Sequence, residues 1–152
     1  MTVVIRPYVT SDIVAVSEIY RQSRPYEFTG ELPHDFSFHA LTREPDVMAM
    51  FVQSIVFVLE EDRVVKGFIG YVHDYIAWLY VHPDFHGQRV GCRLLMYVLA
   101  QLKDKPVRLS LVQSNQVARD FYESFGFSEV GTFGFEFQGK QLQGIRMERP
   151  IQ

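Results

Sequence analysis

The sequence predicts an α/β fold, with a mixed and mostly antiparallel sheet flanked by helices. The run Tyr75–Val81 is aromatic and aliphatic throughout, and a short apolar run without alternation indicates a strand covered on both faces. Beyond Gly91, apolar residues recur at the spacing of one helical face: Leu94, Leu95, Val98, Leu99 and Leu102. Near the end of the chain, Phe133, Phe135 and Phe137 alternate with small or charged residues, which is the period of a strand.

The first part of the chain predicts a strand, a helix and an irregular segment. A β-branched strand, Val3–Ile5, comes first. Polar N-cap candidates and then apolar residues at helical spacing follow: Thr10, Ser11 and Asp12, then Ile13, Val16, Ile19 and Tyr20. The segment Ser23–Ser37 contains prolines, a glycine, aromatic rings and the acids Glu27, Glu31 and Asp35, so we expect an irregular lid.

Two hairpins are predicted, one leading into the Tyr75–Val81 strand and one closing the chain. The further elements, in order, are a helix at Asp46–Gln53, strands at Ile55–Leu59 and Val64–Val72, a strand at Val107–Val112 and a last strand at Leu142–Met147. Pro45 marks the start of that helix. The charged turn Glu60–Arg63 joins the first hairpin, and Gln138–Lys140, which contains a glycine, joins the second.

Composition restricts the class of protein. A length of 152 residues fits one domain, residues 1–152, and a net charge of −3 without clustered Lys and Arg argues against nucleic-acid binding. The first residues lack a signal-peptide pattern, and no apolar run approaches the length of a membrane span. The single cysteine, Cys92, excludes an internal disulfide. We therefore expect a cytoplasmic monomer or homodimer without membrane or nucleic-acid partners.

The histidines predict no metal site. They stand at positions 34, 39, 73, 82 and 86. His82 and His86 are four residues apart, but Pro83 and the loop after it keep them off a common helix face.

The loop His86–Cys92 lies between a predicted strand and a predicted helix, and hence at a helix N-terminus. There the first backbone N–H groups lack intrahelical partners, and the helix dipole presents partial positive charge. Such a turn can hold a phosphate or another anion. The plain alternative is a strand–loop–helix corner with a packing glycine.

This loop and a later segment together resemble the GNAT superfamily of N-acetyltransferases. The acyl-CoA loop of that family reads Q/R-x-x-G-x-G/A, and the corresponding positions here are His86, Gly87, Gln88, Arg89, Val90 and Gly91. The last glycine is kept, whereas His86 replaces Gln or Arg and Arg89 replaces the middle Gly. The segment Ser114–Phe127 matches a later family motif at Asn115, Ala118, Phe121, Tyr122, Gly126 and Phe127. The resemblance covers Val56–Val130 well and the remainder loosely.

The resemblance implies acetyl transfer from acetyl-CoA to an amine. It implies that the parallel strands Tyr75–Val81 and Val107–Val112 splay to admit the cofactor, and that backbone groups of the first strand hold the pantetheine arm and the acyl carbonyl. The expected cofactor-binding residues are Leu79, Tyr80, Val81, His86, Gly87, Gln88, Arg89, Val90, Gly91, Cys92 and Asn115. Tyr122 matches the family's general acid, which meets the departing thiolate.

Three of these residues also have purely structural interpretations. Tyr122 resembles a half-buried packing residue of a Phe-Tyr pair. Asn115 suits a helix N-cap, a role that can coexist with ligand binding. Cys92 fits as a small residue filling space beside the loop, and we do not expect it to be a nucleophile.

The chain departs from the family where a catalytic base is expected. Ser110 stands where some relatives that acetylate protein N-termini carry a Glu, and the Tyr75–Val81 strand has no carboxylate. The candidate bases are therefore His73, Asp74, Glu136 or an acid of the lid, acting directly or through water. Neutralising a lysine at pH 7 costs about 4–5 kcal/mol, against about 1 for an α-amino group. We therefore expect low-pKa acceptors, namely amino acids, N-terminal peptides or amino sugars, attracted by the lid acids.

The predicted function is N-acetyl transfer from acetyl-CoA to a primary amine of a small molecule or peptide. The alternative is a non-catalytic acyl-CoA-binding or sensing domain of the same fold, which the altered loop and missing Glu favour. Tyr122 argues against it, because a pure binder has no use for a thiolate proton donor. A ligand-free interaction protein is a third possibility.

Overall fold

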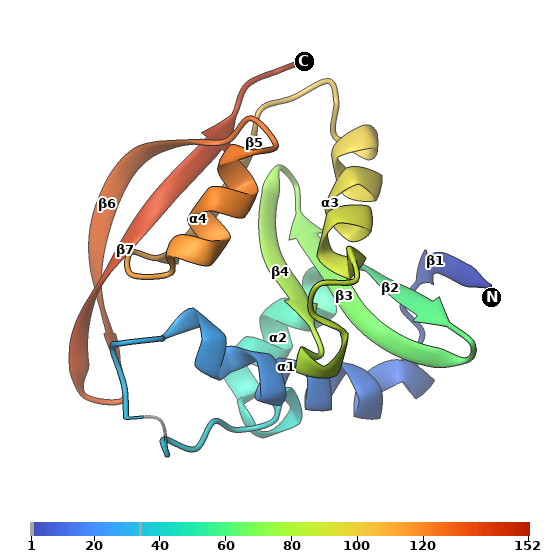
Figure 1. Ribbon diagram of the computed structural model, residues 1–152, viewed down its shortest axis with the longest axis horizontal. Coiled ribbons are helices and arrows are strands. Elements are labelled where there is room, and N and C mark those ends of the chain that lie inside the picture. The colour runs from blue at the N-terminus through green and yellow to red at the C-terminus, as the bar shows by residue number, and fades with distance from the viewer. Residues whose placement is uncertain (1, 34) are drawn as a thin grey trace.

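The computed structural model describes residues 2–33 and 35–152, and in this part seven strands form one sheet in the order β1-β2-β3-β4-β5-β7-β6 (Figure 1). The strands are β1 (Val3–Pro7), β2 (Ile55–Glu61), β3 (Val64–Val72), β4 (Tyr75–Val81), β5 (Val107–Val112), β6 (Ser128–Phe137) and β7 (Lys140–Arg149). The helices are α1 (Ile13–Glu27), α2 (Pro45–Gln53), α3 (Val90–Gln101) and α4 (Gln116–Glu123). Only β4 and β5 pair in parallel, so the predicted α/β class and mostly antiparallel sheet are confirmed for the described residues. His34, the single histidine of the expected lid, lies outside them.

The parallel strands β4 and β5 meet at one end and then separate. Among the described residues they share one registered pair, Tyr75 with Arg108. Figure 1 shows the two strands diverging from there toward their C-terminal ends. The predicted splayed pair is confirmed, and its open end leaves one edge of β4 without a strand partner.

Each face of the sheet carries its own hydrophobic core. On one face α3 and the residue that follows it bury all five residues predicted from the helical spacing: Leu94, Leu95, Val98, Leu99 and Leu102. On the other face α1 and α2 contribute Ile19, Tyr20 and Phe51. The sheet therefore lies between helices on both faces. Its two parallel strands splay apart at the place where the α1 side and the α3 side of the sheet meet (Figure 1).

A β-bulge at Ala77 changes which face β4 presents to each core. Gly70 pairs with Trp78 and the next residue, Tyr71, pairs with Ile76, so Ala77 is an extra residue on β4. Consequently Ile76 joins the α3 core and Trp78 joins the α1–α2 core. Tyr80 is buried as well, whereas Tyr75, Ala77, Leu79 and Val81 are only half-buried, so the expectation of a strand covered on both faces holds in part.

The expected lid, Ser23–Ser37, is helical at its start, and the prediction of an irregular segment is wrong for its first five residues. Helix α1 continues to Glu27 and contains Pro25, whose missing N–H removes one hydrogen bond in the last turn. The turn is anchored because Ser23, which is buried, donates its hydroxyl to the carbonyl of Val81 (2.8 Å). This end of α1 thereby lies against the end of β4.

Several strands are longer than predicted, because backbone pairing continues past the apolar residues that reveal a strand in sequence. Strand β2 runs to Glu61, which leaves the two-residue turn Asp62–Arg63, with φ of 53° and 69°. Strand β6 begins at Ser128 because that residue still pairs with Glu148 of β7.

The N-cap candidate Asp12 serves another purpose. Its carboxylate accepts hydrogen bonds from the guanidinium of Arg6 (2.8 Å) and from the N–H of Val9 (2.9 Å), and it does not cap α1. This interaction ties β1 to the start of the helix.

Candidate active site

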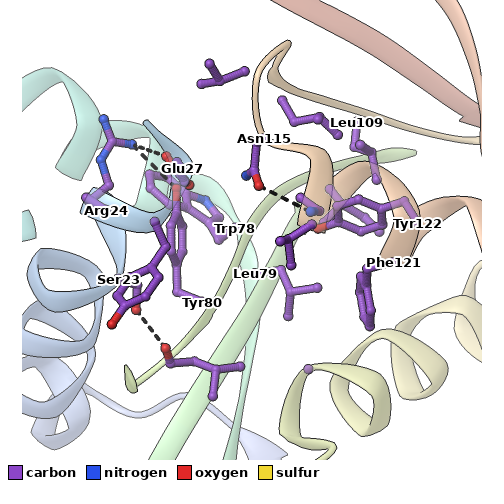
Figure 2. A pocket seen from close by; sticks show the side chains of 18 of the residues that line it. Ser23, Arg24, Glu27, Trp78, Leu79, Tyr80, Leu109, Asn115, Phe121 and Tyr122 are labelled. Carbon is purple, nitrogen blue, oxygen red and sulfur yellow. Dashed lines mark hydrogen bonds and ion pairs between the residues drawn. The ribbon is translucent and has the colours of Figure 1, made fainter. Parts of the chain in front are cut away.

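A cavity of about 900 Å³ opens between the splayed strands, within the size range of small-molecule sites. Eleven of the twelve residues predicted as site residues line it: Leu79, Tyr80, Val81, His86, Gly87, Arg89, Val90, Gly91, Cys92, Asn115 and Tyr122. Gln88 is the exception. Figure 2 shows Arg24 and Glu27 of α1 on one side of β4, and Asn115 and Tyr122 on the other. We call these two sides the acceptor wall and the cofactor wall.

The open edge of β4 presents backbone groups to the cavity. The N–H of His82 bonds the carbonyl of Lys66 on β3 (2.9 Å), and in an antiparallel pair alternate residues face the partner strand. Leu79 and Val81 therefore face away from β3, toward the splay. The Val81 carbonyl is used by Ser23, so the N–H and carbonyl of Leu79 and the N–H of Val81 are left for a ligand.

Tyr80 differs from its neighbours on β4. Its backbone faces β3 by the same alternation, and its buried side chain lines the cavity. Burial, and then the negative charge of Glu27, raises the pKa of the Tyr80 phenol well above its ordinary value. We expected a backbone role at this position, whereas the side chain is what reaches the site.

The loop before α3 has the backbone shape of an anion site. Gly87 and Arg89 have positive φ, 80° and 64°, and Arg89 is the left-handed residue from which α3 begins. For a residue with a Cβ this conformation costs about 1–2 kcal/mol. The first N–H groups of α3, at Val90 and Gly91, lie at the cavity and have no intrahelical partners.

Side chains of the same loop support this shape. The His86 ring bonds the Val81 carbonyl through Nε2 (3.0 Å) and packs edge-on against Tyr26. Arg89 is exposed, and its Nη2 lies 3.9 Å from Sγ of Cys92. Cys92 is half-buried in the first turn of α3, which agrees with its interpretation as a small packing residue.

Asn115 caps α4 and also lines the cavity. Its Oδ1 accepts a hydrogen bond from the N–H of Ala118 (3.2 Å), which is the expected N-cap. Among the described residues its amide nitrogen has no partner, so the Nδ2 donors are available to a ligand while the cap remains intact.

Tyr122 projects from α4 into the cavity. The ring packs edge-on against Phe127 and Phe121, at centroid distances of 5.5 and 5.2 Å. Burial, followed by the negative charge of Glu27 from the opposite wall, raises the pKa of Tyr122 above its ordinary value. The packing interpretation and a place at the cavity therefore apply together, because the ring is held by its aromatic neighbours while the residue lines the cavity.

On the acceptor wall, Arg24 and Glu27 form an ion pair, with 3.3 Å between Nη1 and Oε2. The Arg24 side chain is only 15% exposed, and its Nη1 also lies 3.5 Å from the Tyr80 hydroxyl. Four aromatic rings surround the guanidinium at 5.0 to 5.8 Å: Tyr20, Phe28, Phe38 and Phe137. Sequence reasoning named Glu27 but missed Arg24, although acid and base three residues apart on a helix were a readable signal.

The remaining candidate bases lie away from the cavity. Asp74 pairs with Arg108 (3.0 Å) at the closed end of the splay, and hydrogen bonds from Arg108 lower its pKa. His73 and Glu136 are exposed, and neither lines the cavity. Glu27 is the candidate that does.

The described part of the chain contains no cluster of three or more His, Cys, Asp or Glu residues placed to hold a metal ion. None of its helices combines the length and apolarity needed to cross a membrane.

Comparisons with known proteins agree with this geometry. The family model of the acetyltransferase (GNAT) domain matches residues 52–129. The L-amino acid N-acyltransferase MnaT of Escherichia coli (strain K12) is 30% identical over 133 residues, covering 77% of this chain and 74% of that protein. A crystal structure of a GCN5-related N-acetyltransferase from Rhodopseudomonas palustris is similar with a TM-score of 0.77 at 21% identity, covering 99% of this chain and 96% of that one. The structure of yncA from Salmonella typhimurium with its cofactor acetyl-CoA gives a TM-score of 0.73 at 20% identity, covering 100% and 95%.

Proposed function

Because the chain belongs to the GNAT family of acetyltransferases, and so transfers an acetyl group from acetyl-CoA to an amine, we propose that its acceptor is a small molecule with a low-pKa primary amine. The observation that carries this proposal is the arrangement of the cavity. Tyr122 and the backbone donors occupy one wall, and Glu27 occupies the other (Figure 2). We further propose that residues 1–152 act as one N-acetyltransferase domain.

Acetyl-CoA supplies the acetyl group as a thioester, and the cofactor wall suits a ligand of this chemistry. The N–H groups of Val90 and Gly91, together with Arg89, offer positive charge to a pyrophosphate. The free edge of β4 at Leu79 offers a donor to an acyl oxygen that gains charge. The Nδ2 of Asn115 would donate to an amide carbonyl of the pantetheine arm.

Glu27 is the group we assign to neutralising the amine. Its carboxylate is the lid acid that lines the cavity, and an ammonium placed against it can transfer a proton before the amine attacks. The cost of neutralising the amine then decides the acceptor. It is about 1 kcal/mol at pH 7 for an α-amino group and about 4–5 for a lysine.

Tyr122 is the group we assign to the departing thiolate. Its ordinary pKa near 10 already exceeds that of a thiol near 8.5, by about 1.5 units. Since burial raises the pKa of Tyr122 further, a lowered phenol pKa is not the route by which this site acts. We propose that the phenol stabilises the sulfur through a hydrogen bond in the transition state, with full proton transfer left to solvent.

An acceptor of the amino-acid kind is supported by the relative MnaT, whose name states that it acts on L-amino acids. The amines of N-terminal peptides and amino sugars have a low pKa, whereas the adjacent carboxylate of a free amino acid raises its amine pKa, although not to that of a lysine. Turnover on lysine side chains at neutral pH above every such amine would refute the proposal.

The test is an acetyl-CoA-dependent thiol-release assay on a panel of amino acids, amino-acid amides, N-terminal peptides, amino sugars and N-α-blocked lysine. We expect release with at least one low-pKa amine. Acetyl-CoA binding without release on any amine would instead favour a binding or sensing domain.

A further inference from the structure

The acceptor wall holds one cation and one anion side by side in an apolar setting. Arg24 and Glu27 are neighbours on the last turn of α1, 3.3 Å apart, and both line the cavity. Surface ion pairs on a helix are common, but this one is mostly covered. A charge pair at the end of a cavity is an arrangement that a ligand with two opposite charges can match.

The guanidinium of Arg24 has hydrogen-bonding capacity left over. Both of its polar contacts, to Glu27 and to Tyr80, are made by Nη1. Its Nε is buried and has no hydrogen-bond partner among the described residues. An unpaired buried donor is costly and rare in folded proteins, so its retention beside a cavity calls for an explanation. Arginine also has the planar donor geometry that fits a carboxylate, which a lysine lacks.

The rest of the wall is aromatic. Phe28 and Trp78 are buried at the cavity, and β6 directs three half-buried rings into it: Phe133, Phe135 and Phe137. Outside the Arg24–Glu27 pair, a charged side chain of a ligand would lose its hydration here without a partner. An apolar or aromatic side chain would instead gain contact with the rings.

We propose that the acceptor is a free α-amino acid with an apolar or aromatic side chain, its carboxylate bound by Arg24 and its ammonium by Glu27. The two charges of such a zwitterion sit on one carbon and match the adjacent pair on α1. This inference rests on the proposed function and narrows it, because amino-acid amides, simple amines and peptides lack a carboxylate next to the amine.

The test compares leucine, leucinamide, 3-methylbutylamine and glutamate as acceptors in the thiol-release assay. The wild-type protein prefers leucine to leucinamide by about tenfold or more in kcat/KM, the scale of one charge-assisted hydrogen bond. The lower amine pKa of the amide by itself works in the opposite direction. Glutamate is poorer than leucine by a similar factor.

In Arg24→Gln the preference for leucine over leucinamide falls to within about threefold of unity, through a raised KM for leucine. Arg24→Lys, which keeps a cation among the rings, retains part of it. The matched control is Arg21→Gln, on the same helix, whose exposed partner is Glu18. Circular dichroism and calorimetry of acetyl-CoA binding verify that each variant is folded.

Two results overturn the inference while leaving the proposed function intact. One is equal turnover of leucine and leucinamide by the wild-type protein. The other is an equal loss for both acceptors in Arg24→Gln and Arg24→Lys. Absence of thiol release with every amine overturns the proposed function, and this inference with it.

Discussion

The two walls of the cavity offer different kinds of groups to the ligands that we propose for them. The cofactor wall relies on backbone: the first turn of α3, the free edge of β4 at Leu79, and the cap at Asn115. The acceptor wall relies on side chains, with Arg24 and Glu27 set among aromatic rings. Backbone groups survive substitution, so the first wall tolerates a His or an Arg where the family pattern has other residues. The second wall has no such tolerance, and single substitutions there should change acceptor choice.

Tyr122 lies on the cofactor wall, but its proposed role depends on a side chain, so it gives the largest expected effect. Tyr122→Phe keeps the ring against Phe121 and Phe127 and removes the hydroxyl. We expect kcat to fall about 10²-fold or more, while the Kd of acetyl-CoA changes less than about threefold. Steady-state kinetics and calorimetry measure the two quantities.

The pH profile sharpens this assignment. Because the pKa of Tyr122 is raised in the folded protein, the phenol stays protonated past its ordinary value near 10. The wild-type rate should therefore show no loss from phenol ionisation up to about pH 10. Near-normal turnover in Tyr122→Phe would remove this residue from the mechanism.

Glu27 gives the next largest effect, on the opposite wall. Glu27→Gln keeps the size of the side chain but can no longer accept a proton, so kcat/KM should fall about 10- to 10²-fold at pH 7. The loss should shrink as pH rises toward the pKa of the acceptor amine, because solvent then supplies neutral amine. Acetyl-CoA affinity should stay unchanged.

The matched control for that variant is Glu31→Gln. Glu31 lies near Lys140, at 3.9 Å, and does not line the cavity. Equal losses in the two variants would mean that the charge of the segment matters and not the position of Glu27.

The difference between the walls also explains what the sequence could predict. Backbone sites at helix starts need residues at fixed spacing, so the loop at Gly91 and the cap at Asn115 could be predicted from the sequence, and the resemblance to the GNAT family added Tyr122 on the same helix. The acceptor wall is built from α1, β4 and β6, which are far apart in sequence. The residues next to Arg24 in the sequence therefore do not predict that its guanidinium will lie over the Phe137 ring. The bulge at Ala77 was equally hidden, because it is a property of the pairing of two strands.

A substitution at Gly144 tests how far acceptor binding depends on the packing of the acceptor wall. Gly144 pairs across the sheet with Phe133, and a Cβ on Gly144 would clash with the Phe133 ring. Gly144→Ala must therefore displace the ring, at a cost of about 1–3 kcal/mol in unfolding free energy. We expect a raised KM for the acceptor with acetyl-CoA affinity preserved. Gly134→Ala, with 3.6 Å to its nearest neighbour, is the control. An equal rise in the acceptor KM in Gly134→Ala and Gly144→Ala would exclude a specific role for Phe133.

The smallest expected effect concerns Arg89, which offers a charged side chain on a wall that otherwise offers mainly backbone groups. Arg89 holds φ of 64°, a conformation that costs a residue with a Cβ about 1–2 kcal/mol. Its exposed guanidinium stands at the start of α3, where an anion would bind. We expect Arg89→Ala to raise the Kd of acetyl-CoA about three- to tenfold at low salt and less at high salt, because an exposed contact is screened.

Two further variants separate charge from backbone strain. Arg89→Gly loses the same charge but also relieves the strain of the left-handed backbone conformation. It should therefore bind acetyl-CoA as Arg89→Ala does, but unfold at a higher denaturant concentration than Arg89→Ala. Arg93→Ala removes an exposed cation from the next turn of α3, outside the cavity, and should leave affinity unchanged. If Arg89→Ala binds acetyl-CoA as tightly as the wild-type protein at both salt concentrations, the backbone of this wall suffices without the side chain. The contrast between the two walls would then be complete.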